Sequence, residues 1–253
     1  MLKSLLAIFC LLAASAAWAQ LADDDHDSAA MAQARDHLLH MHGDSLNYLV
    51  IGERLENQVH DGDSSLVWEA QGWVGYDTNK LWLKSEGLYD NEANDTQAFE
   101  LQALWSHAIW PWWDVQAGWR HDFEGANRNY AVIGLMGLAP YWFELDAAAF
   151  LSDDGDASAR LEAEYELRFT QRLILQPRVE LNYAFSDVPE AGIGQGMHTG
   201  EFGLRLRYEF RREIAPYLGV AWEKSWGETA NLLRAAGKDT SETSFILGLR
   251  LWY

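Results

Sequence analysis

The 253-residue sequence is poor in several residue classes, and each shortage excludes a type of protein or site. Its one cysteine, Cys10, lies near the start, so the chain after residue 19 offers no disulfide, thiolate nucleophile or thiolate metal ligand. Lysine and arginine number 19 against 38 aspartates and glutamates, which argues against nucleic-acid binding and a basic membrane-surface patch. No apolar run after residue 19 approaches the roughly 20 residues of a transmembrane helix.

The first nineteen residues are typical of a secretory signal peptide. Lys3 supplies the positive start, and residues 5–14 form a short apolar core. Ala17 and Ala19 then give the small-x-small pattern that predicts cleavage before Gln20. A lipoprotein signal at Cys10 is the competing interpretation, but that cysteine follows bulky residues and comes too early.

From about residue 46 the hydrophobic pattern has a period of two. In residues 159–169, apolar side chains alternate strictly with Arg160, Glu162, Glu164, Glu166 and Arg168. A strand separates such sets onto two faces, whereas a helix would mix them. About twelve such segments of about ten to thirteen residues can be counted, the length of a tilted membrane-spanning strand. They lie near 46–57, 65–76, 80–90, 97–108, 113–123, 129–138, 142–152, 158–169, 173–185, 200–211, 216–225 and 243–253.

The connections between these segments alternate in length, which is typical of an up-and-down outer-membrane barrel. Short turns are expected at residues 110–112, 139–140, 170–172 and 212–215, and longer polar loops near 90–96, 124–128, 153–157, 186–199 and 226–242. Aromatic residues near the segment ends suit the girdles of such a barrel; they are Trp112, Trp113, Tyr141, Trp142, Trp222 and Trp226. The last segment closes on aromatic Tyr253, which resembles the signal read by the barrel-assembly machinery.

We therefore predict an all-β fold: a transmembrane antiparallel up-and-down β-barrel of about twelve strands, preceded by a short mobile arm over residues 20–45. A soluble secreted barrel or sandwich is the alternative, because periodicity alone does not say which face meets water. The even number of strands, their length and the aromatic residues at strand ends favour the outer membrane. Outer-membrane lipid would then be a partner of the barrel. The charged faces would then fill a narrow polar lumen; they carry Arg160, Glu162, Glu164, Glu166, Arg168, Arg178, Glu180, Glu201, Arg205, Arg207 and Glu209.

The arm holds the best candidate metal ligands. A short helix could begin at Ser28 and end at Gly43. His37, His40 and Met41 would then project from one face, because residues three and four apart are neighbours on a helix. Imidazole suits copper and zinc, and thioether selects Cu(I). The predicted copper ligands, for Cu(I) or Cu(II), are His37, His40, Met41, His42, His26 and Met31; the alternative is a solvated polar linker.

The barrel sequence also resembles a known family, the copper-resistance protein B family of outer-membrane proteins. The resemblance spans residues 46–253 and rests on Trp68–Gly75, Leu81–Gly87, Trp113–Gly118, Gly137–Glu144, Ala159–Arg168, Thr170–Pro177, Gly203–Glu209 and Arg211–Tyr217. It implies copper binding, copper tolerance and an outer-membrane location. Members often carry Met-x-x-Met repeats in a long N-terminal tract, whereas this arm has only Met31 and Met41.

The combined prediction is a non-enzymatic protein that binds copper ions at a periplasmic arm, for sequestration or outward passage, with periplasmic copper proteins as candidate partners. A general small-solute porin without metal binding is the first alternative. A barrel lipase is the second, but it needs a serine and a histidine on one face. Ser106 and His107 are neighbours in sequence and would face opposite ways in a strand.

Overall fold

The computed structural model describes residues 28–42, 45–125 and 127–253. The predicted signal peptide and His26 lie outside these residues. The chain divides into a unit that ends at Ser45 and a barrel unit from Leu46 to Tyr253. The elements are α2 (Ser28–His42), β1 (Asn47–His60), β2 (Asp63–Gly75), β3 (Asn79–Asp90), β4 (Asp95–Trp110), β5 (Trp113–Asp122), β6 (Asn129–Ala139), β7 (Phe143–Ser152), β8 (Ala157–Glu164), β9 (Leu167–Arg168), β10 (Leu173–Ala184), η1 (Pro189–Ala191), β11 (Gly196–Tyr208), β12 (Ile214–Ser225), α3 (Gly227–Ala235) and β13 (Ser241–Trp252).

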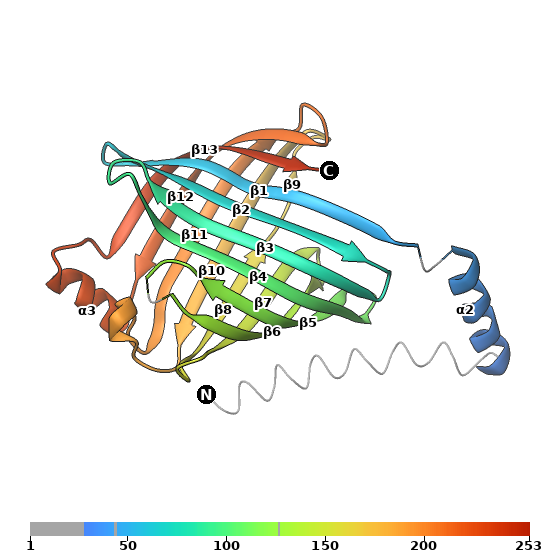
Figure 1. Cartoon of the computed structure of the whole chain (residues 1–253). Helices are drawn as coiled ribbons and strands as arrows, with labels where there is room; N and C mark the ends of the chain where they lie inside the picture. The colour runs from blue at the N-terminus through green and yellow to red at the C-terminus, as the bar shows by residue number, and fades with distance from the viewer. Residues whose placement is uncertain (1–27, 43–44, 126) are drawn as a thin grey trace. The chain divides into compact units, whose positions relative to one another are not determined.

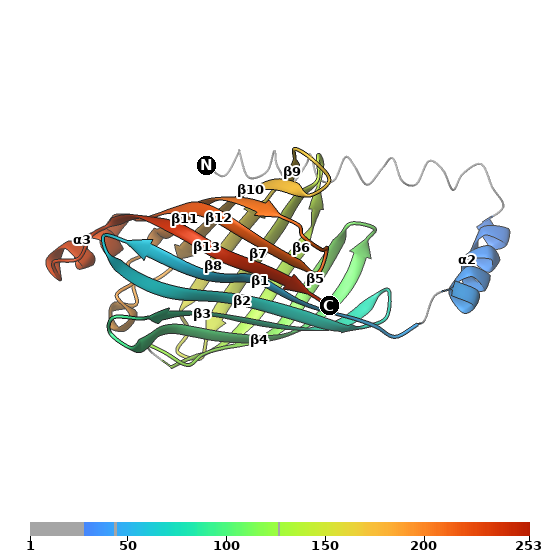
Figure 2. The same ribbon diagram turned by 90° about the horizontal axis from the view of Figure 1, so that it is seen from above.

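The strands form one closed antiparallel barrel (Figures 1 and 2). From β1 to β8 and from β10 to β13 each strand pairs with the next in sequence, and β13 pairs with β1 to close the sheet. β8 and β9 both pair with β10 and occupy one position, so the barrel has the twelve positions that the periodicity predicts. The prediction of a transmembrane up-and-down barrel is confirmed.

One predicted strand is interrupted. The segment 158–169 was expected to be continuous, but it splits into β8 and β9 at Tyr165 and Glu166. The register does not change across the break: Arg178 of β10 faces Glu164, and Leu175 faces Leu167. Tyr165 N–H still donates to the Pro177 carbonyl oxygen at 3.1 Å. Pro177 has no N–H to return, which removes one ladder bond and explains the interruption.

The two ends of the barrel differ. At the end that holds the start of β1 and the end of β13, short segments join the strands at residues 76–78, 111–112, 140–142, 169–172 and 209–213. At the opposite end, residues 61–62 and 91–94 are tight turns, while 123–128, 153–156, 185–195 and 226–240 are longer and include η1 and α3 (Figure 1). The predicted alternation holds except near 90–96, where Asn91–Asn94 make a four-residue turn.

The distribution of burial is inverted relative to a soluble protein. Phe245, Leu247 and Ile133 project from the barrel and are at least 62% exposed. Arg178, Arg205 and Glu56 project into the lumen and are buried. An apolar exterior around an ionised interior is stable only when lipid surrounds the barrel. The soluble alternative is therefore excluded.

Candidate functional site

A β-bulge in β1 brings two consecutive charged residues into the lumen. The pairing of β1 with β2 shifts register between Gly52 and Arg54, so Glu53 is inserted into the strand. Such an extra residue breaks the strict in–out alternation of a strand. Glu53 lines one lumenal cavity and Arg54 lines another, whereas alternation would have put one of them in lipid.

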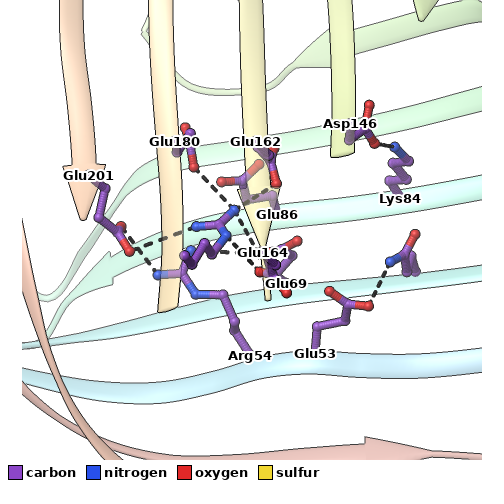
Figure 3. Close-up of polar contacts among 12 residues, drawn as sticks. Glu53, Arg54, Glu69, Lys84, Glu86, Asp146, Glu162, Glu164, Glu180 and Glu201 are labelled. Atoms are coloured by element: carbon purple, nitrogen blue, oxygen red, sulfur yellow. Dashed lines mark hydrogen bonds and ion pairs between the residues drawn. The ribbon is translucent and has the colours of Figure 1, made fainter. Parts of the chain in front are cut away.

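Arg178 on β10 is buried in the lumen, at 2% exposure. Its guanidinium lies within 4 Å of five carboxylates, which belong to Glu162 (2.8 Å), Glu164 (3.0 Å), Glu180 (3.2 Å), Glu69 (3.4 Å) and Glu201 (3.8 Å). Glu69 stands on β2, which four strands separate from β10. In Figure 3, Glu201, Glu180 and Glu162 extend from one wall toward Glu69 and Arg54 on the facing wall. The contact therefore spans the lumen.

Arg160 on β8 makes a second contact across the lumen. Its Nη1 lies 2.9 Å from Glu86 Oε2 on β3, and its Nη2 lies 2.9 Å from Glu100 Oε2 on β4. Arg120 on β5 shares Glu100 at 2.8 Å. The Phe150 ring lies under both guanidinium groups, 4.7 Å from Arg120 and 5.7 Å from Arg160.

Arg54 joins the same network through Glu56 (3.1 Å), Glu201 (3.5 Å) and Glu69 (3.6 Å). We call this network the ionic layer; it consists of Arg54, Arg160 and Arg178 with Glu56, Glu69, Glu86, Glu100, Glu162, Glu164, Glu180 and Glu201. Glu56 is fully buried and also accepts bonds from Arg205 and from Tyr217 Oη. Charge-assisted hydrogen bonds from this many donors fix the buried carboxylate in place.

The lumen also contains an apolar cluster, formed by Trp82, Leu104, Val132 and Phe150 from β3, β4, β6 and β7. Trp73, Tyr130, Met136 and Ala148 pack against it. Beside it, Lys84 pairs with Asp146 across three intervening strands (Figure 3). The sequence pattern assigned polar character to the whole lumen and did not predict this cluster.

Two of the lumenal cavities share part of their lining. The first, of about 420 Å³, lies toward the end of the barrel with the start of β1 and the end of β13, and is lined by the apolar cluster, eight carboxylates and three basic side chains. The second, of about 330 Å³, lies toward the long loops and is lined by seven carboxylates and three arginines. Both cavities therefore carry an excess of negative charge, which favours cations over anions.

The predicted arm helix is present as α2, which begins at Ser28 and ends at His42. His37, His40 and Met41 therefore stand at positions i, i+3 and i+4 of a continuous helix, as the spacing requires for a shared face. His37 is exposed and Met31 is partly buried. His42 is the last residue of α2, while Gly43 and His26 lie outside the described residues.

No group of three or more histidine, cysteine, aspartate or glutamate side chains with metal-site geometry occurs among the residues that the structure describes. His107 and His121 are instead bonded to Asn79 and Asn129, and each stacks on a tryptophan two residues before it. In the described part of the chain, no helix combines the length and apolar character needed to cross a membrane.

Comparison with known proteins agrees with this architecture. A solved NanC porin structure is similar in fold, with a TM-score of 0.52 at 12% sequence identity, covering 81% of this chain and 99% of that one. Copper resistance protein B of Escherichia coli is 42% identical over 231 residues, which are 91% of this chain and 77% of that protein. The copper resistance protein B homolog of Pseudomonas syringae pv. tomato is 44% identical over 214 residues, 84% of this chain and 72% of that protein.

The family model described as "Copper resistance protein B precursor (CopB)" matches residues 46–253, which is the whole barrel from the start of β1 to the last residue. The match covers every strand that contributes to the lumenal network. It excludes α2, where the predicted copper ligands lie. The chain belongs to the copper resistance protein B family.

Proposed function

We propose that this protein supports copper tolerance from the outer membrane, by binding copper ions at the arm that precedes β1 and either sequestering them or passing them outward. The family assignment supports the role in copper tolerance. The proposed binding site is supported by α2, a continuous helix over Ser28–His42. On such a helix the i, i+3 and i+4 spacing of His37, His40 and Met41 favours a shared face.

The chemistry of these side chains fits copper. Imidazole nitrogen binds Cu(II) and Cu(I), and thioether sulfur prefers Cu(I). Beyond residue 19 the sequence has no cysteine, so histidine and methionine are the softest donors that it offers. Because a copper-binding imidazole must be neutral, binding should weaken at acidic pH.

The direction of the arm follows from the connections. In outer-membrane barrels the short turns face the periplasm and the long loops face outward. The first strand, β1, starts at the end with the short turns. The arm would therefore lie in the periplasm, where it could take copper from periplasmic copper proteins.

Copper titration of the purified chain tests the site. Isothermal calorimetry with Cu(I) and with Cu(II) should show saturable binding that is lost in the His37→Ala, His40→Ala, Met41→Ala, His42→Ala variant. The matched control is His107→Ala with His121→Ala, which removes two barrel histidines and should bind as the parent does. Equal binding by the parent and the arm variant contradicts the assignment of the site to α2.

Cellular copper tolerance tests the role separately. In a strain that lacks its other copper systems, loss of the gene should lower the copper concentration that stops growth. The arm variant should lower this concentration as well, because it lacks the proposed copper ligands while its barrel is intact. Unchanged tolerance after gene loss contradicts the proposed function, whatever the calorimetry shows.

A general porin and an enzyme are the alternatives. The ionic layer crosses the lumen at two places, through Arg160 and Arg178, which does not suit an open, unselective pore. Ser106 is buried in the lumen and donates to Asp114, while His107 bonds to Asn79. These two side chains do not form a catalytic pair, which supports a non-enzymatic role.

A further inference from the structure

The two lumenal cavities meet at one set of side chains. Among the residues that line the first cavity, toward the short turns, are Glu86, Glu100 and Arg160. The same three line the second cavity, toward the long loops. The Arg160 bridge to Glu86 and Glu100 is therefore the partition between the two spaces.

We propose that Arg160 is the barrier and selectivity-determining residue of a cation path through the lumen. Its guanidinium is the positive charge between two cavities that each carry excess negative charge. A cation in either cavity meets that fixed charge, and an anion meets the carboxylates around it. This goes beyond copper binding at α2, because it concerns the lumen and any small ion.

The bridge is held on several sides, which makes it a fixed barrier. Arg160 Nε lies 3.3 Å from Asn182 Oδ1 and 3.9 Å from Glu180 Oε1, in addition to its pairs with Glu86 and Glu100. The Phe150 ring of the neighbouring strand β7 lies 5.7 Å from the guanidinium and packs against it. Such a guanidinium has little freedom to swing aside, since each displacement breaks charge-assisted hydrogen bonds.

Arg178 fills a different part of the cross-section. It lines neither cavity and is enclosed by the five carboxylates around it. Removal of Arg178 would disturb the packing of the ionic layer, whereas removal of Arg160 would join the two cavities directly. The partition can therefore be tested at Arg160 without removal of the other cross-lumen contact.

The experiment is planar-bilayer conductance of the purified chain in KCl, with the reversal potential measured across a salt gradient. Arg160→Gln should raise single-channel conductance by at least about threefold and shift selectivity toward K⁺, because the barrier charge is lost and the carboxylates remain. Glu86→Gln with Glu100→Gln should shift selectivity the opposite way, toward Cl⁻, because the guanidinium remains and two carboxylates are neutralised. Arg168→Gln is the matched control: it lies in β9, lines neither cavity, and should behave as the parent does.

Folding is checked by heat-modifiable migration in gel electrophoresis. A folded Arg160→Gln variant with the conductance and reversal potential of the parent overturns the proposal. A shift of both variants in the same direction also overturns it. If Arg160→Gln does not fold, the double glutamine variant decides: a shift toward Cl⁻ supports the proposal and an unchanged reversal potential overturns it. The readout uses K⁺ and Cl⁻ only, so its failure is distinct from failure of copper binding at α2.

Discussion

The lumen is filled in two ways: through the apolar cluster on β3, β4, β6 and β7, and through the ionic layer that joins β1, β2, β8, β10 and β11 to the facing strands. The apolar cluster links strands that are close in sequence. The ionic layer links β8 to β3 and β10 to β2, which are far apart around the barrel. The cluster should therefore stabilise one part of the wall, and the ionic layer should hold opposite walls together.

The difference also lies in what a single substitution leaves behind. Loss of an apolar side chain leaves a void whose cost grows with its volume. Loss of one arginine leaves several buried carboxylates without their cation. The free-energy cost of those unpaired charges exceeds the net stabilisation that the ion pairs contributed.

The largest loss is expected for Arg178→Met, which keeps an unbranched stem and removes the charged guanidinium group. Five carboxylates lose their shared cation, and the free energy of unfolding should fall by about 3–5 kcal/mol. Urea unfolding in detergent, followed by tryptophan fluorescence, measures it. Arg168→Met is the control, since Arg168 is 68% exposed and pairs with Glu166 alone among its described ion pairs; its loss should stay below about 1 kcal/mol. Similar losses for both would show that the ionic layer is not a stabilising unit.

Leu104→Ala should have the next largest effect. Leu104 is 1% exposed at the centre of the apolar cluster, and its truncation should lower the free energy of unfolding by about 3 kcal/mol. Leu247→Ala, on the membrane-facing side at 62% exposure, should cost less than half of that because no enclosed void forms. The same urea titration compares them. A larger loss at Leu247 would mean that lipid contacts, not lumenal packing, stabilise the barrel.

Tyr217→Phe makes a smaller change in the ionic layer. The phenol of Tyr217 donates to Glu56 Oε1 at 3.0 Å, so its removal takes one donor from a fully buried carboxylate. The expected loss is about 1–2 kcal/mol, because other donors to Glu56 remain. Tyr183→Phe, on the membrane-facing side, should leave the unfolding midpoint unchanged. No change at Tyr217 would imply that Arg205, Arg54 and Gln58 satisfy Glu56 without the phenol.

Much of this fold follows from the alternation of side chains. The period of two assigns Arg178, Arg205 and Glu201 to one face, and turn spacing gives the number of strands, because each face and each turn is a local property. Two exceptions have local causes that alternation does not encode. Glu53 enters the lumen through a bulge, and Pro177 interrupts the neighbouring strand through its missing N–H.

The lumenal contacts could not be read in the same way. That Arg160 reaches Glu86 depends on which strands face each other after closure, and this is set by strand number, tilt and stagger of the whole barrel. The helix in the arm was predicted because its spacing is local. Copper binding by its side chains depends on the metal ion as well as on the helix, so it stays a prediction.

The smallest expected effect concerns the turn between β6 and β7, at the end of the barrel with the short turns. Tyr141 and Trp142 have φ of 70° and 67°, the left-handed region that favours glycine and asparagine. Tyr141 is 82% exposed, so little packing offsets its backbone strain. Tyr141→Asn should therefore raise the free energy of unfolding in detergent by up to about 1 kcal/mol, while Tyr141→Ala, which keeps a Cβ without the asparagine side chain, should give no gain. The prediction is contradicted if both substitutions lower the free energy of unfolding and the parent, with Tyr141 retained, is stabilised when the barrel is placed in lipid. That result would show that the aromatic ring anchors the barrel at the membrane interface more strongly than the strained turn opposes folding.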